Sequence, residues 1–213
     1  MQGAALEGDE LVVVGYEADH IIEHIGTLRH RPEVAFHFNP RFEQGSVISL
    51  WAAEETLRSG QDVLVMDADV LYHPGILQRL IESPQDNVYL FDGDFEDGEE
   101  PVKIALDDGA MVEFRKQLAP GLQYQRLGES VGFFRFNAAV AAHIADECER
   151  FDSEGLSDAP HEEALRNVLL RDPAQFSIED VSGMPWIEID FPEDVERAEQ
   201  VILPAIRADF PDF

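Results

Sequence analysis

The first third of the chain alternates short apolar runs with segments of helical periodicity, and this alternation constrains the fold more than any other feature. Strands are predicted at residues 11–15, 34–38 and 62–66, and helices at 17–28, 46–59 and 74–83. Helical crossovers of this kind connect parallel strands. The alternation therefore predicts an α/β fold with a mixed, mainly parallel sheet, helices on both faces and ligands at the carboxyl ends of its strands.

The second half changes character, because strand-like runs there follow one another closely. Residues 87–91, 101–116 and 129–136 have strand patterns, and Asp108-Gly109 is a hairpin turn signal, so antiparallel pairing is expected. The acidic stretch 92–100 is interpreted as a solvated connection. The remaining predicted elements are helices near 137–151 and 160–171, strands near 176–181 and 186–190, and a last helix over 192–208.

Length and hydropathy predict one globular domain over residues 1–213. No apolar run approaches the roughly 20 residues that a membrane-spanning helix needs, and the first ten residues lack the basic and apolar regions of a signal peptide. We therefore expect a cytoplasmic protein without membrane insertion. Its oligomeric state stays open, with a homo-dimer as one option.

The chain is strongly acidic. Its 44 Asp and Glu residues against 15 Lys and Arg residues give a formal net charge of −29, which repels nucleic acid and disfavours it as a partner. Only two of the basic residues are lysines, Lys103 and Lys116. Each lysine is therefore a candidate for a specific role.

Two carboxylates follow the apolar strand 62–66 where the chain leaves the sheet. Asp67 and Asp69 can bond turn amides or cap a helix, or they can form a hard-cation site at the carboxyl edge of the sheet. Mg²⁺ typically takes one or two protein carboxylates together with substrate phosphates, so a nucleotide would fit there. One pair of acids leaves both interpretations open.

A second acidic strand end lies far along the chain, in the segment "GMPWIEIDFPEDVERAEQVI". Asp190 sits on the strand side of a turn, as Asp69 does, and Asp194 is interpreted as negative charge in the first turn of the following helix. Two such edges brought together could hold a divalent ion.

Five stretches, in order along the chain, carry a resemblance to a known family: "VMDADVLYHPGILQRL", "PVKIALDDGAMVEFRK", "GESVGFF", "HEEALRNVL" and "GMPWIEIDFPEDVERA". They resemble nucleotidyltransferases of the MobA-like, GT-A-related fold. The nearest branch is the cytidylyltransferases that activate phosphorylated small alcohols, such as phosphocholine and inositol-1-phosphate cytidylyltransferases. The resemblance runs from about Leu11 to the C-terminus and implies a three-layer, Rossmann-like (GT-A-type) fold.

The resemblance implies a reaction, in which the phosphate of the substrate attacks the α-phosphorus of CTP, with Mg²⁺ as cofactor, and pyrophosphate leaves. Asp69 and Asp190 match the two metal-binding aspartates. Lys116 matches the lysine that points into the substrate phosphate site, although a surface lysine is the alternative. These three residues are the predicted catalytic set.

The resemblance also implies residues for the acceptor alcohol. Glu129 and Glu162 match acidic positions that face the acceptor pocket, and Trp186 could form an aromatic wall for a quaternary ammonium. Alternatively, Glu162 is first-turn helix charge and Trp186 belongs to the core. A carboxylate suits either a polyol or an ammonium group, so the charge of the acceptor stays open.

For the nucleotide, the resemblance implies a loop and helix start in "FNPRFEQGSVISLWAAEE". Gly45 would permit close backbone approach, and Ser46 and Ser49 offer hydroxyls, with Asp67 as a further candidate. Ser46 is otherwise an ordinary N-cap. The branch often carries asparagine-rich residues near this point, and "QGSVIS" departs from that pattern, so the base is less well defined.

One feature of the family is missing from this sequence. Members begin with a strand and a glycine-rich loop of the type LAAGxGxR, whereas "MQGAALEGDELVVVGYEAD" resembles the end of the first helix and the second strand. The first βα unit is therefore expected to be lacking, through a late start codon, a fragment or a degenerate paralogue. Besides the cytidylyltransferase, the sequence leaves open a sugar-1-phosphate nucleotidyltransferase using UTP or GTP, a non-catalytic nucleotide-binding module and a GT-A glycosyltransferase.

Overall fold

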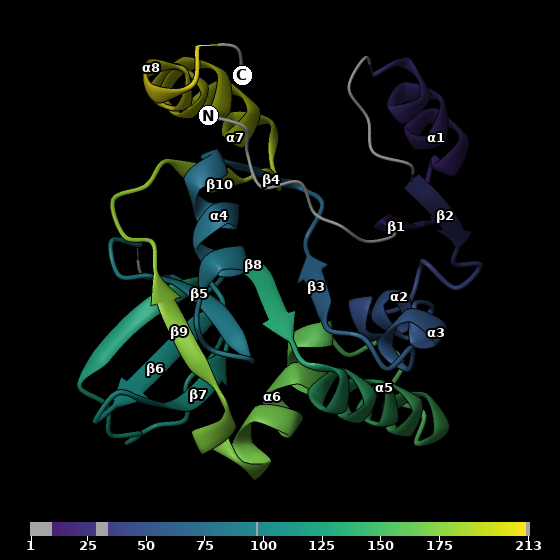
Figure 1. Ribbon diagram of the computed structural model, residues 1–213, viewed down its shortest axis with the longest axis vertical. Helices are drawn as coiled ribbons and strands as arrows, with labels where there is room; N and C mark the ends of the chain where they lie inside the picture. Colours follow the sequence, from purple (N-terminus) through teal and green to yellow (C-terminus); the bar gives the residue numbers. More distant parts are fainter. Residues whose placement is uncertain (1–9, 29–33, 97, 212–213) are drawn as a thin grey trace. The chain divides into compact units, whose positions relative to one another are not determined.

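The computed structural model describes residues 10–28, 34–96 and 98–211 (Figure 1). The chain forms two compact units, and each unit combines a segment from the first half of the sequence with a segment from the second half. The first unit comprises residues 1–61 and 138–168, and the second comprises residues 62–137 and 169–213. Among the described residues, no helix is both long and apolar enough to cross a lipid bilayer.

The first unit begins with the predicted strand–helix–strand series. Strand β1 (Glu10–Val14) runs parallel to β2 (Val34–Phe38), and α1 (Ala18–Thr27) lies between them in sequence. The predicted helix at 46–59 is two short helices, α2 (Ser46–Trp51) and α3 (Glu54–Leu57), because the backbone turns at residues 52–53. Both contact α5 (Ala138–Ser153).

The second unit is built on a six-stranded sheet whose strands come in the order β7-β6-β8-β5-β9, with β3 also paired to β8. Its strands are β3 (Val63–Met66), β5 (Val88–Asp92), β6 (Lys103–Asp107), β7 (Ala110–Arg115), β8 (Arg126–Phe136) and β9 (Ser177–Asp180). Among the described strands of this sheet, β5 and β9 pair in parallel and the other pairs are antiparallel. The prediction of a mainly parallel sheet is therefore wrong for these ladders.

The long strand β8 explains this difference. It pairs antiparallel with β6 through residues 126–129 and with β3 through residues 133–136, so these two strands share one of its edges. Strand β5 pairs with its other edge. Because β3 and β5 are both antiparallel to β8, they run in the same direction, and β8 lies between them. The predicted hairpin at Asp108-Gly109 is confirmed, with both turn residues at positive φ.

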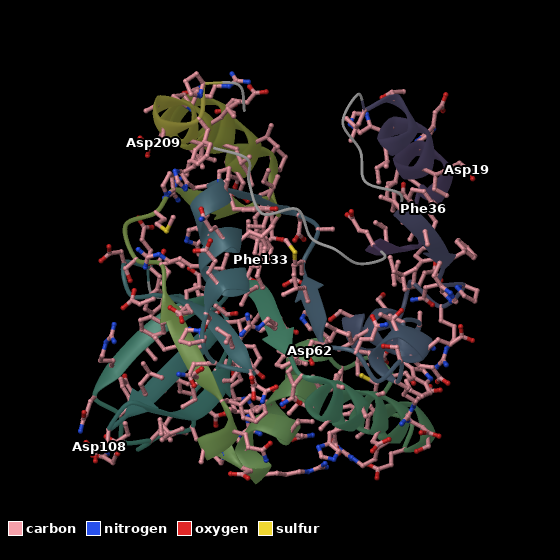
Figure 2. The ribbon with its side chains drawn as sticks, in the orientation of Figure 1. Asp19, Phe36, Asp62, Asp108, Phe133 and Asp209 are labelled. Atoms are coloured by element: carbon pink, nitrogen blue, oxygen red, sulfur yellow. The ribbon has the colours of Figure 1, made fainter. Side chains whose placement is uncertain are left out.

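Helix α4 (Pro74–Glu82) covers one face of this sheet, over β5 and β8 (Figure 1). Its Ile76 and Leu80 are fully buried and pack in a cluster that includes Phe133, which is marked in Figure 2. A second group of rings surrounds Tyr89, which makes edge-on contacts to its neighbours Phe114, Phe134, Phe136 and Phe176. The sheet is thus packed tightly on the side chains of α4 and around Tyr89.

Two short strands and the C-terminal helices complete the second unit. Strand β4 (Val70–Tyr72) pairs antiparallel with β10 (Trp186–Glu188). Helix α7 (Pro192–Arg197) continues through the π-helical segment η2 (Ala198–Ile202) into α8 (Leu203–Asp209), as the predicted last helix requires. The remaining elements are α6 (His161–Arg171) and η1 (Pro173–Gln175).

Arg135 of β8 holds the end of α4 and provides a test of this packing. Its guanidinium donates to the carbonyl oxygens of Leu80 at 3.0 Å, Ile81 at 2.7 Å and Ser83 at 2.9 Å, and also to that of Gln85. Such carbonyls have no partner within their own helix. We expect Arg135→Met to lower the free energy of unfolding by about 2–4 kcal/mol, measured by urea denaturation.

The matched variant is Arg135→Lys, which keeps the charge. An ammonium cannot reproduce the planar fork of the guanidinium, so we expect only partial recovery of stability. A loss below about 0.5 kcal/mol for Arg135→Met would place the stabilisation of the α4 end elsewhere.

Candidate functional site

The pairing of β4 with β10 brings the two acidic strand ends together. Val70 lies opposite Glu188 in this antiparallel ladder, and the N–H of Ile189 donates to the carbonyl of Asp69 at 2.9 Å. The ladder therefore continues one step past each strand. It places Asp69, which precedes β4, beside Asp190, which follows β10.

Three carboxylates converge at this point. One oxygen each from Asp69, Glu188 and Asp190 lies within 4.8 Å of the other two, and all three side chains are exposed. Ligands on opposite sides of one divalent ion lie about 4–5 Å apart, and Mg²⁺ and Ca²⁺ prefer oxygen ligands. The donor set therefore fits a hard divalent cation. The sequence predicts Asp69 and Asp190 as metal-binding residues, and Glu188 is the third carboxylate of the cluster.

The electrostatics of the three carboxylates agree with this fit. Desolvation of its carboxyl group and the negative charges of Asp190, Asp69 and Asp67 raise the pKa of Glu188 to about 7. Desolvation and the charge of Asp69 likewise raise the pKa of Asp190. Unfavourable negative charge is thus concentrated here, and a bound cation would offset it.

The backbone next to Asp190 is held by the start of α7. The carboxylate of Asp194 accepts from the N–H of Asp190 at 3.1 Å and from that of Phe191 at 2.8 Å. This confirms the interpretation of Asp194 as a first-turn helix residue. Because these bonds involve only the backbone of Asp190, its side chain is left to face Asp69.

Asp67 lies against β8. Its N–H donates to the carbonyl of Gly132 at 3.1 Å, and a Cβ added to Gly132 would lie 2.3 Å from the Asp67 Oδ2 atom. Gly132 also has φ +78°, a region that favours glycine. Asp67 is not one of the three converging carboxylates, and its role in binding nucleotide stays a prediction.

Lys116 follows the last residue of β7. Its Nζ lies 3.1 Å from the Oε2 atom of Glu100. Its positive charge also lowers the pKa of both Glu188 and Asp190, against the other effects at those groups. Lys116 is therefore the cation beside the converging carboxylates. Glu100, in the stretch 92–100 that is interpreted as a solvated connection, has an exposed side chain that pairs with this lysine.

A row of ionisable residues crosses three neighbouring strands of the same sheet. Lys103 of β6 and Asp92 of β5 both lie opposite Glu129 of β8, and directly opposite residues share one face of a sheet. The indole Nε1 of Trp186 donates to the Asp92 Oδ2 atom at 2.7 Å. Two predicted acceptor residues, Glu129 and Trp186, thus meet at the carboxylate of Asp92, which is 7% exposed.

Glu129 should make stability depend on pH. Desolvation and the negative charge of Asp92 raise its pKa from 4.5 to about 7, while Lys103 opposes this shift. A carboxyl group with a raised pKa stabilises the fold fully below pH 4.5, and this stabilisation is lost as pH rises through about 7. Glu129→Gln mimics the protonated form. We therefore expect its free energy of unfolding, relative to that of the parent, to increase as the pH is raised from 5 to 8.

Urea denaturation at both pH values measures this difference. The control is Glu99→Gln, which removes an exposed glutamate of the same unit and should shift stability equally at the two values. If the stability of the Glu129 and Glu99 variants, relative to the parent, changed equally between pH 5 and pH 8, this would contradict a raised pKa at Glu129.

The other predicted residues belong to the first unit. The close approach that Gly45 permits is made to the chain itself, since an added Cβ would lie 2.2 Å from the carbonyl oxygen of Ala159. The Ser46 hydroxyl accepts from the N–H of His161 at 2.8 Å, so it caps the start of α6 and not its own helix. Ser49 accepts from the Asn39 amide at 3.2 Å.

Glu162, the remaining predicted acceptor residue, also lies in the first unit. One of its carboxylate oxygens is 3.2 Å from the Nδ1 atom of His161. It stands in the first turn of α6, as the alternative interpretation expects. Binding roles for Gly45, Ser46, Ser49 and Glu162 stay predictions.

Sequence comparison supplies a relative of this chain. The bifunctional IPC transferase and DIPP synthase of Rubrobacter xylanophilus is 27% identical over 210 residues, which cover 95% of this chain and 43% of the relative. The chain thus spans less than half the length of the curated relative it matches. No family model matches the chain.

Two solved structures have a similar fold. The inositol-1-phosphate CTP transferase from T. maritima has a TM-score of 0.66 at 17% identity, with 92% of this chain and 76% of that chain covered. The CTP:phosphocholine cytidylyltransferase from Streptococcus pneumoniae has a TM-score of 0.59 at 17% identity, with coverage of 91% and 78%. These likenesses confirm the α/β class, and the relative and both structures are of the kind that the five motifs resemble.

Proposed function

We propose that this chain is a Mg²⁺-dependent nucleotidyltransferase, a cytidylyltransferase that converts CTP and a phosphorylated small alcohol to a CDP-alcohol and pyrophosphate. The observation that carries the proposal is the convergence of Asp69, Glu188 and Asp190 beside Lys116, at a strand edge of a nucleotidyltransferase-like sheet. The name of the relative, an IPC transferase, supports the reaction class.

The residues divide the chemistry between charge and position. Asp69, Glu188 and Asp190 would hold Mg²⁺, which when bound offsets phosphate charge and makes the α-phosphorus more electrophilic. A phosphate oxygen of the acceptor forms the new bond to that phosphorus as the bond to the β-phosphate oxygen breaks, and pyrophosphate leaves. Lys116 lies where a cation can orient the acceptor phosphate and offset its charge.

The acceptor alcohol would lie along the row at Asp92 and Glu129. Trp186 stands on the same side of β10 as Glu188, because side chains two residues apart in a strand point to one face. The contact of Trp186 with Asp92 therefore connects the row to the converging carboxylates. Hydroxyls or an ammonium group would both find carboxylate partners there.

Pyrophosphate release tests the proposal. The assay uses Mg²⁺, each of the four NTPs and a panel of phospho-alcohols, with the 213-residue chain and with a chain that includes the residues encoded in frame upstream. We expect turnover with CTP and one acceptor, and greater turnover in the longer chain if it supplies the glycine-rich loop. Turnover with UTP or GTP and a sugar phosphate would favour the sugar-1-phosphate nucleotidyltransferase.

Two other results would overturn the proposal. Transfer of a sugar from a nucleotide-sugar, without pyrophosphate, would identify a glycosyltransferase. Nucleotide binding without turnover in either folded chain would identify a binding module.

A further inference from the structure

Lys103 carries a buried positive charge that the proposed chemistry does not use. It is 6% exposed, and its Nζ donates to the carbonyl of Gly98 at 2.5 Å and to that of Lys116 at 3.0 Å. Burying an ammonium is costly unless hydrogen bonds and opposite charges compensate for lost water. An apolar side chain would fill this position at lower cost, so the charge calls for a specific explanation.

The two carbonyls belong to the two segments that carry the ion pair beside the carboxylates. Gly98 lies two residues before Glu100, and Glu100 pairs with the Lys116 side chain. The β6–β7 ladder ends where Lys103 lies opposite Arg115, so the ladder itself does not fix Lys116. The Lys103 ammonium extends past the end of this ladder and holds the next residue.

Lys103 also lies next to Glu129 in the row of ionisable residues. Lys103 lies opposite Glu129 in the β6–β8 ladder, and its charge lowers the pKa of Glu129 against the effects of desolvation and Asp92. One side chain thus contacts the backbone of the phosphate-facing lysine and acts electrostatically on the acceptor-facing glutamate.

We propose that Lys103 is a positioning residue that fixes Lys116 and the Gly98–Glu100 segment and supplies the positive charge next to Glu129. Its effect on positioning concerns this chain alone, whereas its effect on catalysis rests on the proposed function. The two effects call for separate measurements.

The lysine content of the chain allows a direct measurement of positioning. Lys103 and Lys116 are its only lysines, so protein labelled with ¹³C at lysine Cε gives two signals. In Lys103→Met, which keeps a similar stem without the charge, one signal disappears. We expect the line width of the remaining Lys116 signal to decrease by about twofold, because the Lys116 carbonyl loses its hydrogen bond to Lys103 and the residue becomes more mobile. The change in its chemical shift on addition of Mg²⁺ should also differ from that of the parent.

Three variants make the result decisive. Lys103→Arg keeps the charge and donors and should retain a Lys116 signal close to that of the parent. Lys103→Gln keeps a donor without the charge and replaces the methionine variant if that variant does not fold. Arg126→Met is the control, because it removes an ion pair with Asp180 elsewhere on β8 and should leave Lys116 unchanged. Identical Lys116 signals in the parent and the neutral variants would overturn the proposal.

Steady-state kinetics measure the catalytic effect. We expect Lys103→Met to lower kcat/KM for the acceptor by about 10- to 100-fold with little change in KM for the nucleotide, and Lys103→Arg to recover part of the loss. An equal loss for both substrates would indicate a general structural role and overturn the proposal. If neither the 213-residue chain nor the longer chain has turnover, the proposed function fails, while the Lys116 signal still decides whether Lys103 positions it.

Discussion

Asp190→Asn is expected to lower turnover by at least about 10²- to 10³-fold while the fold stays intact, and Asp69→Asn should behave in the same way. Each change replaces a carboxylate of the proposed metal site by a neutral amide at a strand edge, where core packing is not involved. The N–H groups that Asp194 accepts from belong to the backbone, so the start of α7 is kept in Asp190→Asn. Half-saturation by Mg²⁺ should move to higher concentration in both variants.

These aspartate variants should also relieve repulsion. Asp190 and Asp69 both raise the pKa of Glu188, so each substitution should lower that pKa and leave thermal stability equal to or above that of the parent. Titration of the Glu188 carboxyl by NMR and thermal unfolding measure these effects without any assay of activity.

The control is Asp108→Asn, the same chemical change in the exposed hairpin turn between β6 and β7 (Figure 2). Asparagine tolerates the positive φ of this position, so neither activity nor stability should change. Near-parental activity of Asp69→Asn or Asp190→Asn at moderate Mg²⁺ would contradict the proposed metal site.

The alternation of strands and helices could be read from the sequence because local periodicity encodes it. The strands at 34–38 and 62–66 and the hairpin at Asp108-Gly109 lie where the pattern predicts, within one residue. Partner choice is not local. Nothing in the sequence of β8 indicates that it lies between β3 and β5, because the same apolar alternation suits a strand paired on either side.

The candidate site shows the same division. Asp69 and Asp190 could be predicted because each follows an apolar strand, and acids at strand ends are a usable signal. That signal also marks Asp92, which follows "NVYLF" and is 7% exposed, although the stretch 92–100 is interpreted as a solvated connection. Glu188 was not predicted as part of the site, because a polar residue in an alternating strand resembles one that faces solvent. Its approach to Asp69 depends on the β4–β10 register, which is not a local property of the sequence.

The contacts of Ser46 and Lys103 depend wholly on tertiary structure. Ser46 looks like the N-cap of its own helix, but its hydroxyl bonds the start of α6, which is 115 residues away in sequence. Lys103 is one charged residue in an apolar strand, a pattern that does not distinguish a solvent-facing ammonium from a buried one. Only the pairing of β6 with β7 and β8 shows what surrounds it.

Lys116→Ala should reduce acceptor use most strongly, with kcat/KM for the acceptor lowered by about 10²- to 10³-fold and a smaller change in KM for the nucleotide. The physical reason for the loss is that the Lys116 ammonium orients the acceptor phosphate in the proposed mechanism. Its charge also acts on Glu188 and Asp190. Without it, the pKa of Glu188 should rise above 7, so protons compete with Mg²⁺ at neutral pH. The pH at which Mg²⁺ binds half-maximally should therefore move upward.

Two substitutions separate this role of Lys116 from a general loss of charge. Glu100→Gln removes the partner of Lys116 but keeps the ammonium, so acceptor use should be kept or improved because the lysine is no longer held by a competing carboxylate. Arg126→Gln removes a positive charge elsewhere in the same unit, where Arg126 pairs with Asp180, and should have little effect on the acceptor. If Lys116→Ala and Arg126→Gln lowered activity equally, the loss would reflect the net charge of the protein. A selective effect of Lys116→Ala, together with the upward shift in the pH dependence of Mg²⁺ binding, would link the lysine to both the acceptor phosphate and the carboxylates.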